Sequence, residues 1–175
     1  RHEHGILDIS IVPPRVSAAL AAQAQQATLA IAERLHYVGV LCVEFFVVGG
    51  RLLANEIAPR PHNSGHYTID ACVTSQFEQQ ARILAHLPLG DPALHCAAVM
   101  MNLLGELWAE GEPSWERLLV NPRAKLHLYG KREPRAGRKM GHCTVLAESA
   151  EAALQQAMAR RAVLLAQPLP AGAVC

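Results

Sequence analysis

Residues 40–48 read Val40-Leu41-Cys42-Val43-Glu44-Phe45-Phe46-Val47-Val48, an almost unbroken apolar run. Gly49-Gly50 follows as a turn signal, and residues 51–58 form a second extended segment. Apolar and β-branched runs on both sides of a glycine pair are typical of two strands joined by a tight turn. The sequence therefore predicts a β-hairpin here, and the rest of the first half is interpreted around it.

One residue of this run is not apolar. Glu44 lies among Val, Leu and Phe, where burying a carboxylate is costly unless it meets a partner, a proton or a metal. The other arm carries Asn55 and Glu56. A two-residue loop pairs Glu44 with Asn55 and sends Glu44 and Glu56 to opposite faces, because side chains alternate along a strand. A loop with an odd residue count, which two glycines also allow, places both carboxylates on one face as diagonal neighbours.

Two carboxylates and an amide on one face would form an all-oxygen ligand set. Such a set suits Mg²⁺, which keeps waters and nucleotide phosphates in its remaining positions. The alternative interpretation is a hydrogen-bonded Glu44 and a solvated Glu56, since structural ion pairs also use acids in such places. Spacing alone favours neither interpretation.

A polar loop leaves the hairpin, with the sequence Pro59-Arg60-Pro61-His62-Asn63-Ser64-Gly65-His66. Two prolines stiffen it and exclude a helix or a regular strand. Arg60 offers a planar fork for a carboxylate or a phosphate, and His62 and Asn63 can orient a polar substrate or move a proton. Because loops at strand ends often carry function, the sequence predicts a site here.

The remaining segments predict strands and helices in mixed order. Strands are expected at 6–12, 97–104, 125–129 and 140–146, and helices at 16–35, 75–86 and 148–165. The apolar stripe of the first helix is interpreted as core packing. The predicted fold class is α/β (α+β), with antiparallel strands and packed helices. A breaker cluster near residues 87–92 predicts two domains, 1–90 and 91–175, the second small and mostly β with a terminal helix.

A basic connection joins the last two predicted strands. It contains Lys131, Arg132, Arg135, Arg138 and Lys139, with glycines among them. Glycines let the backbone approach an anion and the basic side chains neutralise it, so one interpretation is a binding site for the phosphate of a small substrate. The other is a solvated basic turn, because runs of like charge commonly lie in solvent.

Composition limits the function classes. The chain has 175 residues, of which 51% are hydrophobic and 18% charged, which excludes a disordered chain. Sixteen basic against fifteen acidic residues argue against a nucleic-acid or anionic-membrane surface, and no apolar run reaches membrane length. Five cysteines without a Cys-x-x-Cys pattern indicate thiols in a reducing cytoplasm. A start without Met or a leader suggests the interior of a longer protein.

Several motifs occur in one order along the chain. They are His2-x-x-Gly5-Ile6-Leu7, Gly39-Val40 through Glu44-Phe45, Asn55-Glu56-Ile57-Ala58-Pro59-Arg60-Pro61-His62-Asn63-Ser64-Gly65-His66, Ser75-Gln76-Phe77-Glu78 and Gly137-Arg138-Lys139-Met140-Gly141-His142. In these motifs the chain resembles the carboxy-terminal half of the N5-carboxyaminoimidazole ribonucleotide synthases, the ATPase subunits of phosphoribosylaminoimidazole carboxylase. That family belongs to the ATP-grasp superfamily. The segment from Asn55 to His66 is the most specific, and the resemblance covers essentially the whole chain.

The resemblance implies an ATP-dependent carbon–nitrogen ligase. Such an enzyme uses ATP, Mg²⁺ and bicarbonate to carboxylate 5-aminoimidazole ribonucleotide through carboxyphosphate in de novo purine biosynthesis, and it is expected to be a cytoplasmic homodimer without a nucleic-acid or membrane partner. The implied roles are metal binding by Glu44 and Glu56, nucleotide binding by His2, Asn55 and Glu56, catalysis by Arg60, His62 and Asn63, and ribonucleotide binding by Lys131, Arg138 and Lys139.

The chain departs from the family pattern at three places. His4 stands where the family often has Asp, Ala136 where it has Pro, and Gly130 where it has Asp. The family's amino-terminal domain and nucleotide-binding lid are expected before Arg1, so the 175 residues alone are expected to be inactive. Two alternatives are a formate-dependent glycinamide ribonucleotide transformylase, which has a similar Pro-Arg-Pro-His loop, and a non-catalytic ATP-grasp half-domain.

Overall fold

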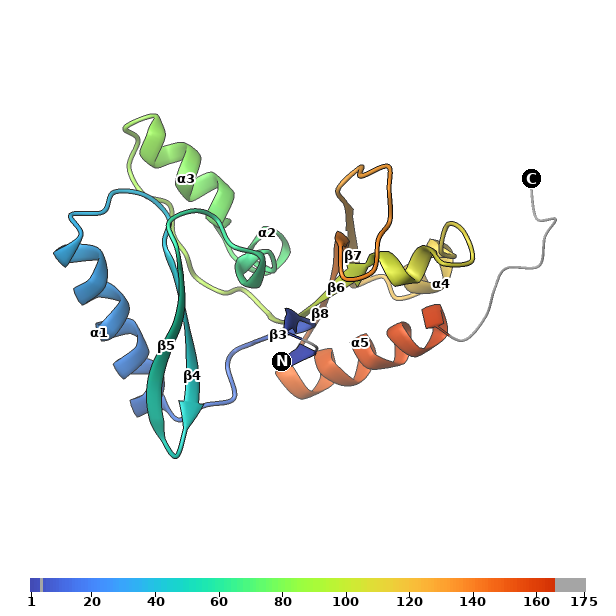
Figure 1. The fold of residues 1–175 in the computed structure, drawn as a ribbon, viewed down its shortest axis with the longest axis horizontal. Coiled ribbons are helices and arrows are strands. Elements are labelled where there is room, and N and C mark those ends of the chain that lie inside the picture. Colours follow the sequence, from blue (N-terminus) through green and yellow to red (C-terminus); the bar gives the residue numbers. More distant parts are fainter. Residues whose placement is uncertain (4, 166–175) are drawn as a thin grey trace. The chain divides into compact units, whose positions relative to one another are not determined.

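The computed structural model describes residues 1–3 and 5–165, so His4 lies outside the described residues (Figure 1). The chain divides into two compact units. One contains Arg1–Pro13 together with the chain from Cys96 onward, and the other contains Pro14–His95. The predicted division into domains 1–90 and 91–175 stays a prediction.

The 14–95 unit combines three helices with a hairpin. Its elements are α1 (Ala18–Arg34), β4 (Cys42–Val48), β5 (Arg51–Ala58), the 3₁₀ turn η1 (Asn63–Gly65), α2 (Thr68–Ala71) and α3 (Gln76–Leu84). Serines begin the two longer helices: the hydroxyl of Ser17 accepts a hydrogen bond from Leu20 N at 3.2 Å, and that of Ser75 from Glu78 N at 3.1 Å. The predicted helices and hairpin are confirmed within a few residues.

The hairpin has a two-residue turn and a bulge. Gly49 and Gly50 have φ of 56° and 76°, which suits a tight primed turn, and Val48 pairs with Arg51. The register shifts between Glu44 and Phe45: Phe45 pairs with Ala54, whereas Glu44 pairs with Glu56. One extra residue, Asn55, therefore lies in β5 at this point. The side chains of Glu44 and Glu56 therefore lie on one face of the hairpin. The expectation that a two-residue turn would place them on opposite faces is wrong, because the extra residue shifts the alternation of side chains along β5 by one position.

The apolar stripe of the first helix is less covered than predicted. No residue of α1 is fully buried in the described part of the chain. The stripe positions inside the helix, Leu20, Ala24, Ala27 and Ile31, are half-buried, whereas Val16 and Leu35, which flank the helix, are 43% and 60% exposed. The sheet of this unit has only two strands, β4 and β5. Among the residues described, the stripe is therefore partly covered along the helix and exposed at its two ends.

The other unit is a four-stranded antiparallel sheet with helices. Its strand order is β3-β6-β8-β7, with β3 (Ile9–Val12), β6 (Ala97–Leu104), β7 (Ala124–Leu128) and β8 (Lys139–Ala147). A short pair, β1 (His2–Glu3) and β2 (Ile6–Leu7), precedes it, and η2 (Gly105–Trp108), α4 (Trp115–Leu119) and α5 (Ala150–Leu165) complete the unit. The predicted fold class, mixed α and β with antiparallel strands, is confirmed.

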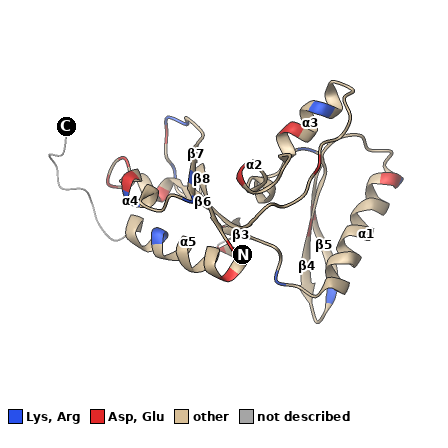
Figure 2. Cartoon of the chain, turned by 180° about the vertical axis from the view of Figure 1, so that it is seen from behind, with Lys and Arg blue, Asp and Glu red and all other residues tan. Residues whose placement is uncertain are grey.

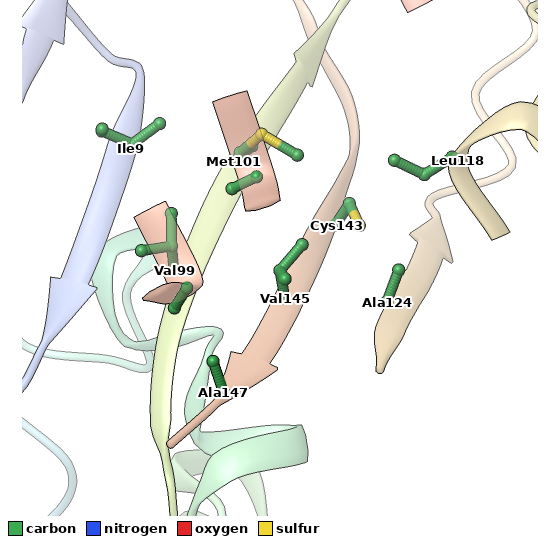
Figure 3. Close-up of a cluster of buried hydrophobic side chains, with 10 residues drawn as sticks. Ile9, Val99, Met101, Leu118, Ala124, Cys143, Val145 and Ala147 are labelled. Carbon is green, nitrogen blue, oxygen red and sulfur yellow. The ribbon is translucent and has the colours of Figure 1, made fainter. Parts of the chain in front are cut away.

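Alternating side chains of the inner strands build the core of this unit (Figure 3). Val99 and Met101 of β6 and Cys143 and Val145 of β8 are at most 2% exposed, and Leu118 of α4 packs with them. The small residues Ala153 and Ala157 allow α5 to approach the sheet closely. Because β6 is buried along almost its whole length, it reads in the sequence as an apolar run interrupted only by Asn102.

A buried carboxylate ties the start of the chain to the last helix. Asp8 is 3% exposed, and Arg161 of α5 donates to its Oδ1 at 2.6 Å. The Arg1 guanidinium lies 3.7 Å from Oδ2 of the same carboxylate.

Among the described residues, no helix combines the length and the apolar character that crossing a bilayer requires.

Candidate functional site

The two predicted metal ligands face each other across the hairpin. Glu44 of β4 and Glu56 of β5 are direct partners in the antiparallel ladder, so their side chains project from the same face. The bulge residue Asn55 donates from Nδ2 to Glu44 Oε2 at 3.3 Å. Glu44 is largely covered, with 17% of its side chain exposed, whereas Glu56 is exposed. The hairpin thus presents one sheltered and one open carboxylate together.

The loop after β5 brings His62 to this carboxylate pair. His62 is buried, and its Nδ1 lies 3.7 Å from Glu44 Oε1. The same nitrogen lies 2.9 Å from Ser64 Oγ. His62 also caps η1, where its side chain accepts from Ser64 N. A short turn after the second proline therefore fixes the imidazole beside Glu44.

Arg60 and Asn63 flank that histidine in the loop. Arg60 is exposed, and its guanidinium donates to the carbonyl of Pro61 at 3.0 Å. Asn63 is the first residue of η1 and is partly exposed. The predicted residues Glu44, Asn55, Glu56, Arg60, His62 and Asn63 thus all belong to one compact unit and lie on the hairpin or on the loop that leaves it. Their predicted roles stay predictions.

Cys42 belongs to the same cluster, although sequence reasoning missed it. Its Sγ lies 3.6 Å from both His62 Nδ1 and Ser64 Oγ. Burial raises the pKa of this thiol, a hydrogen bond with Ser64 lowers it, and the negative charges of Glu44 and Glu56 raise it further. Alternation along β4 could have found this residue, since Cys42 stands two positions before Glu44 and shares its face.

The raised pKa predicts an unreactive thiol at Cys42. An ordinary cysteine with pKa 9.0 is roughly one tenth ionised at pH 8, and Cys42 is expected to be less ionised than that. In a variant that keeps Cys42 as its single cysteine, iodoacetamide should react more slowly at pH 8 in the native than in the urea-unfolded state. The native rate should reach its midpoint above pH 9. Native alkylation at the rate of the unfolded thiol would contradict the shift.

The raised pKa of Cys42 also makes the free energy of unfolding depend on pH. The folded-state pKa of Cys42 lies above the unfolded value of 9.0, so the unfolded chain releases its proton first as the pH rises. The favourable contribution is complete below about pH 9 and is lost above it. Replacing Cys42 with Ala is expected to flatten the fall in unfolding free energy between pH 8 and pH 10.

The donor set of the hairpin fits a hard divalent cation. Carboxylate and amide oxygens are the ligands that Mg²⁺ prefers. Glu44 and Glu56 supply them from paired positions, and Asn55 supplies one from the adjoining bulge. Cys42 does not disturb this set, because a thiol with a raised pKa stays neutral and a neutral thiol is a poor ligand for Mg²⁺.

The predicted ribonucleotide residues lie in the other compact unit. Several basic residues, blue in Figure 2, lie in the connection between β7 and β8. Lys131 Nζ donates to the carbonyl of Lys139 at 2.5 Å and lies 5.3 Å from the ring centre of Tyr129. Arg138 donates to the carbonyl of Glu133 at 2.8 Å. These bonds fold the connection upon itself and bring the three predicted residues into one basic loop, residues 130–139.

The basic loop is anchored at the end of β6. The N–H of Gly137 donates to Glu106 Oε1 at 2.7 Å, and the N–H of Gly105 donates to the carbonyl of Arg138 at 2.9 Å. Gly105 leaves no room for a side chain, because a Cβ there would lie 2.1 Å from the carbonyl oxygen of Arg135. The loop therefore rests directly on the backbone of η2.

His2, the remaining predicted residue, is exposed in β1 and belongs to the same unit as the basic loop. Its pairing partner in the ladder is Leu7. The predicted site residues thus form two groups: one on the hairpin and its loop, and one in the unit that contains β1 and the basic loop. Nothing in the position of His2 tests its predicted contact with a nucleotide.

Two family models match the chain. The ATP-grasp domain matches residues 1–77, and the phosphoribosylaminoimidazole carboxylase C-terminal domain matches residues 98–156. The chain is therefore an ATP-grasp protein. It belongs to the N5-carboxyaminoimidazole ribonucleotide synthase family, and the resemblance predicted from its motifs is confirmed.

The similarity to individual members is high over most of the chain. The N5-carboxyaminoimidazole ribonucleotide synthase of Brucella melitensis is 51% identical over 144 residues, 82% of this chain and 39% of that protein. The crystal structure of the Thermus thermophilus synthetase matches with a TM-score of 0.84 and 44% identity, over 97% of this chain and 45% of the other. The Aspergillus clavatus synthase, solved with ADP and 5-aminoimidazole ribonucleotide, matches with a TM-score of 0.81 and 32% identity, over 94% and 45%. The chain spans about 40% of the length of the curated relatives it matches.

Proposed function

We propose that the protein containing this chain carboxylates 5-aminoimidazole ribonucleotide to N5-carboxyaminoimidazole ribonucleotide in purine biosynthesis, using ATP and bicarbonate. The observation that carries the proposal is the acidic pair Glu44 and Glu56, which face each other in the ladder beside His62. The relatives of this chain bear the name of that synthase. One of them is known in complex with ADP and the ribonucleotide.

Glu44 and Glu56 would hold Mg²⁺, and Asn55 and His2 would contact the nucleotide. A bound Mg²⁺ supplies positive charge to the phosphates of ATP while the γ-phosphoryl group moves. The carboxylates themselves fix the position of that charge, since one is sheltered and held by Asn55. The hairpin bulge serves this purpose directly, because it sets the two acids opposite each other.

Arg60, His62 and Asn63 would act on bicarbonate and carboxyphosphate. In the proposed reaction a bicarbonate oxygen attacks the γ-phosphorus and ADP leaves; the amine of the ribonucleotide then attacks the carboxyl carbon and phosphate leaves. Arg60 offers a fixed positive charge for the anionic oxygens that develop in both steps. His62 and Asn63 offer polar groups on a stiff loop, which would hold a bound substrate in a fixed orientation.

Lys131, Arg138 and Lys139 would bind the phosphate of the ribonucleotide. The basic loop supports this role, because Lys131 and Arg138 are held by hydrogen bonds to backbone carbonyls of the loop, and basic side chains fixed beside glycines suit a phosphate. Gly137 and Gly105 fix the loop at its base. The alternative of a solvated basic turn predicts that charge removal there leaves substrate binding unchanged.

The test compares substrates on the full-length protein. ATP hydrolysis is expected to depend on 5-aminoimidazole ribonucleotide and bicarbonate, and not on glycinamide ribonucleotide and formate. The isolated 175 residues are expected to show no steady turnover. Stimulation by formate and glycinamide ribonucleotide would favour the transformylase alternative. Absence of Mg²⁺-nucleotide binding, measured by calorimetry on the full-length protein, would favour a non-catalytic half-domain.

We also propose a homodimer located in the cytoplasm. None of the four described cysteines, Cys42, Cys72, Cys96 and Cys143, forms a disulfide, which supports a reducing compartment. Sedimentation equilibrium of the full-length protein tests the assembly, and a single monomeric species at micromolar concentration would contradict it.

A further inference from the structure

The loop of the proposed site is held by one side chain of α3. Gln76 Oε1 accepts a hydrogen bond from His62 N at 2.9 Å, and Gln76 Nε2 donates to His62 O at 2.8 Å. A single carboxamide thus satisfies both backbone groups of His62, as a neighbouring strand would. Because His62 Nδ1 lies beside Glu44, this contact sets the distance between the loop and the acidic pair.

The backbone fixes which way the amide of Gln76 points. Exchanging its oxygen and nitrogen would turn Oε1 toward a carbonyl oxygen and the NH₂ group toward an N–H. The orientation is therefore determined by His62. Both hydrogens of Nε2 are then assigned, one to His62 O and the other to His66 Nδ1, which lies 2.9 Å away.

This assignment determines the tautomer of His66. A ring nitrogen that accepts a hydrogen bond carries no proton, so the proton of the neutral imidazole is on Nε2. The ring is partly buried and packs against Phe77, with the ring centres 5.3 Å apart. Nε2 of His66 therefore acts as a hydrogen-bond donor in the loop.

Gly65 permits the close approach that these bonds need. A Cβ at Gly65 would lie 2.8 Å from Gln76 Oε1. Thr68 reinforces the arrangement, because its hydroxyl donates to the carbonyl of Gly65 at 2.7 Å and accepts from Gln76 N at 3.0 Å. The loop is thus built around the side chain and the backbone of one residue.

We propose that Gln76 is a positioning residue: it holds His62 beside the acidic pair and keeps His66 in the tautomer with the proton on Nε2. Its effect on catalysis rests on the proposed function, whereas its effect on His62 and His66 does not. Only Gln has the reach and both polar groups, since Asn is one methylene shorter and Glu cannot donate.

The same helix supplies a matched control. Gln79 Nε2 donates to the carbonyl of Gly90 at 2.7 Å, and Gln79 Oε1 accepts from the N–H of Gly90 at 3.0 Å. This is the same pair of bonds, made to a backbone segment that carries no residue of the proposed site. Gln79→Ala therefore removes an equivalent pair of backbone bonds from the same helix.

The experiment compares Gln76→Ala, Gln76→Glu and Gln79→Ala in the full-length protein. The ¹⁵N shifts of the His66 ring, measured by NMR, report the tautomer, and hydrogen exchange reports the His62 amide. Gln76→Ala should speed exchange of the His62 amide at least tenfold and leave the His66 ring with the intrinsic preference of a neutral imidazole, which favours the proton on Nε2. Gln76→Glu retains the acceptor for His62 N but places a carboxylate oxygen where the amide donated to His66, so it should keep most of the His62 protection and put a proton on His66 Nδ1. Gln79→Ala should change neither.

Activity provides a separate reading. Gln76→Ala is expected to lower kcat about thirtyfold with a smaller change in the KM for ATP, whereas Gln79→Ala stays within about twofold. Absence of a proton on His66 Nδ1 in Gln76→Glu, or equal acceleration of His62 amide exchange in Gln79→Ala, would overturn the proposal. Should Gln76→Ala fail to fold, Gln76→Glu alone decides on the tautomer. If the expected NMR changes occur in a protein without synthase activity, the proposed function fails and the positioning role stands.

Discussion

Replacing Glu44 or Glu56 with Gln in the full-length protein is expected to lower kcat by about 10³-fold, the scale of losing one group that stabilises charge in a transition state. Each change keeps the shape of the side chain and removes one charged ligand of the proposed cation. The Mg²⁺ concentration needed for half-maximal activity should rise as well. Initial rates measured over a series of Mg²⁺ concentrations give both quantities.

The control for this prediction is Glu33→Gln. Glu33 is an exposed acid near the end of α1 in the same unit and has no predicted role in the site, so its removal tests the loss of a negative charge alone. Activity and Mg²⁺ dependence should stay within about twofold, as for most surface changes. If Glu44→Gln or Glu56→Gln behaves like Glu33→Gln, neither acid is a metal ligand.

Gly105→Ala is expected to destabilise the unit that carries the basic loop by about 3 kcal/mol, the upper range for overpacking a buried site. Gly105 is buried, and its new Cβ would meet the backbone oxygen and nitrogen of Arg135 at 2.1 and 2.6 Å. A backbone segment cannot rotate away as a side chain can, so the loop must shift. Urea unfolding gives the stability, and the KM for the ribonucleotide reports the displaced loop.

Gly130→Ala separates this collision from backbone strain. Gly130 lies in the same loop with φ of +66°, and a Cβ there meets no atom within 4 Å. It should cost only about 1 kcal/mol, the penalty of a left-handed conformation for a residue with a side chain. Equal losses in Gly105→Ala and Gly130→Ala would mean that close packing against Arg135 does not hold the loop.

The sequence predicted the elements of the hairpin but not the way in which its register places the acids. The apolar run and the glycine pair are local signals, and they sufficed for two strands and a tight turn. The bulge at Asn55 has no such signal, because an extra residue in a strand looks like any other polar residue. Both loop lengths considered from the sequence assumed a regular ladder, whereas the hairpin combines a two-residue turn with a bulge.

The composition of the candidate site was predictable only where its residues are consecutive. Arg60, His62 and Asn63 stand together in the chain, whereas Gln76 reaches His62 from 14 residues away. A contact of this kind depends on how α3 packs against the loop. Hydrophobic periodicity predicts the helix but not this packing. Cys42 was missed for another reason: it looks like an ordinary apolar residue of a strand.

Long-range pairing also limits what the chain reveals about its units. β3 pairs with β6 although Ile9 and Met101 lie more than ninety positions apart in the sequence. A breaker cluster near residue 90 shows where the chain turns, but not that its first strand belongs with the segment after the turn.

The combination of a minimal turn and one bulge restricts how this hairpin can change length in evolution. Inserting or deleting one residue in one strand, between the acidic pair and the turn, moves the side chains beyond that point to the opposite face of the hairpin. Glu44 and Glu56 would then no longer share a face. Adding one residue to each arm preserves the shared face. The corresponding hairpins of related proteins should therefore differ in length by even numbers of residues. An odd difference should coincide with the loss or the gain of a bulge.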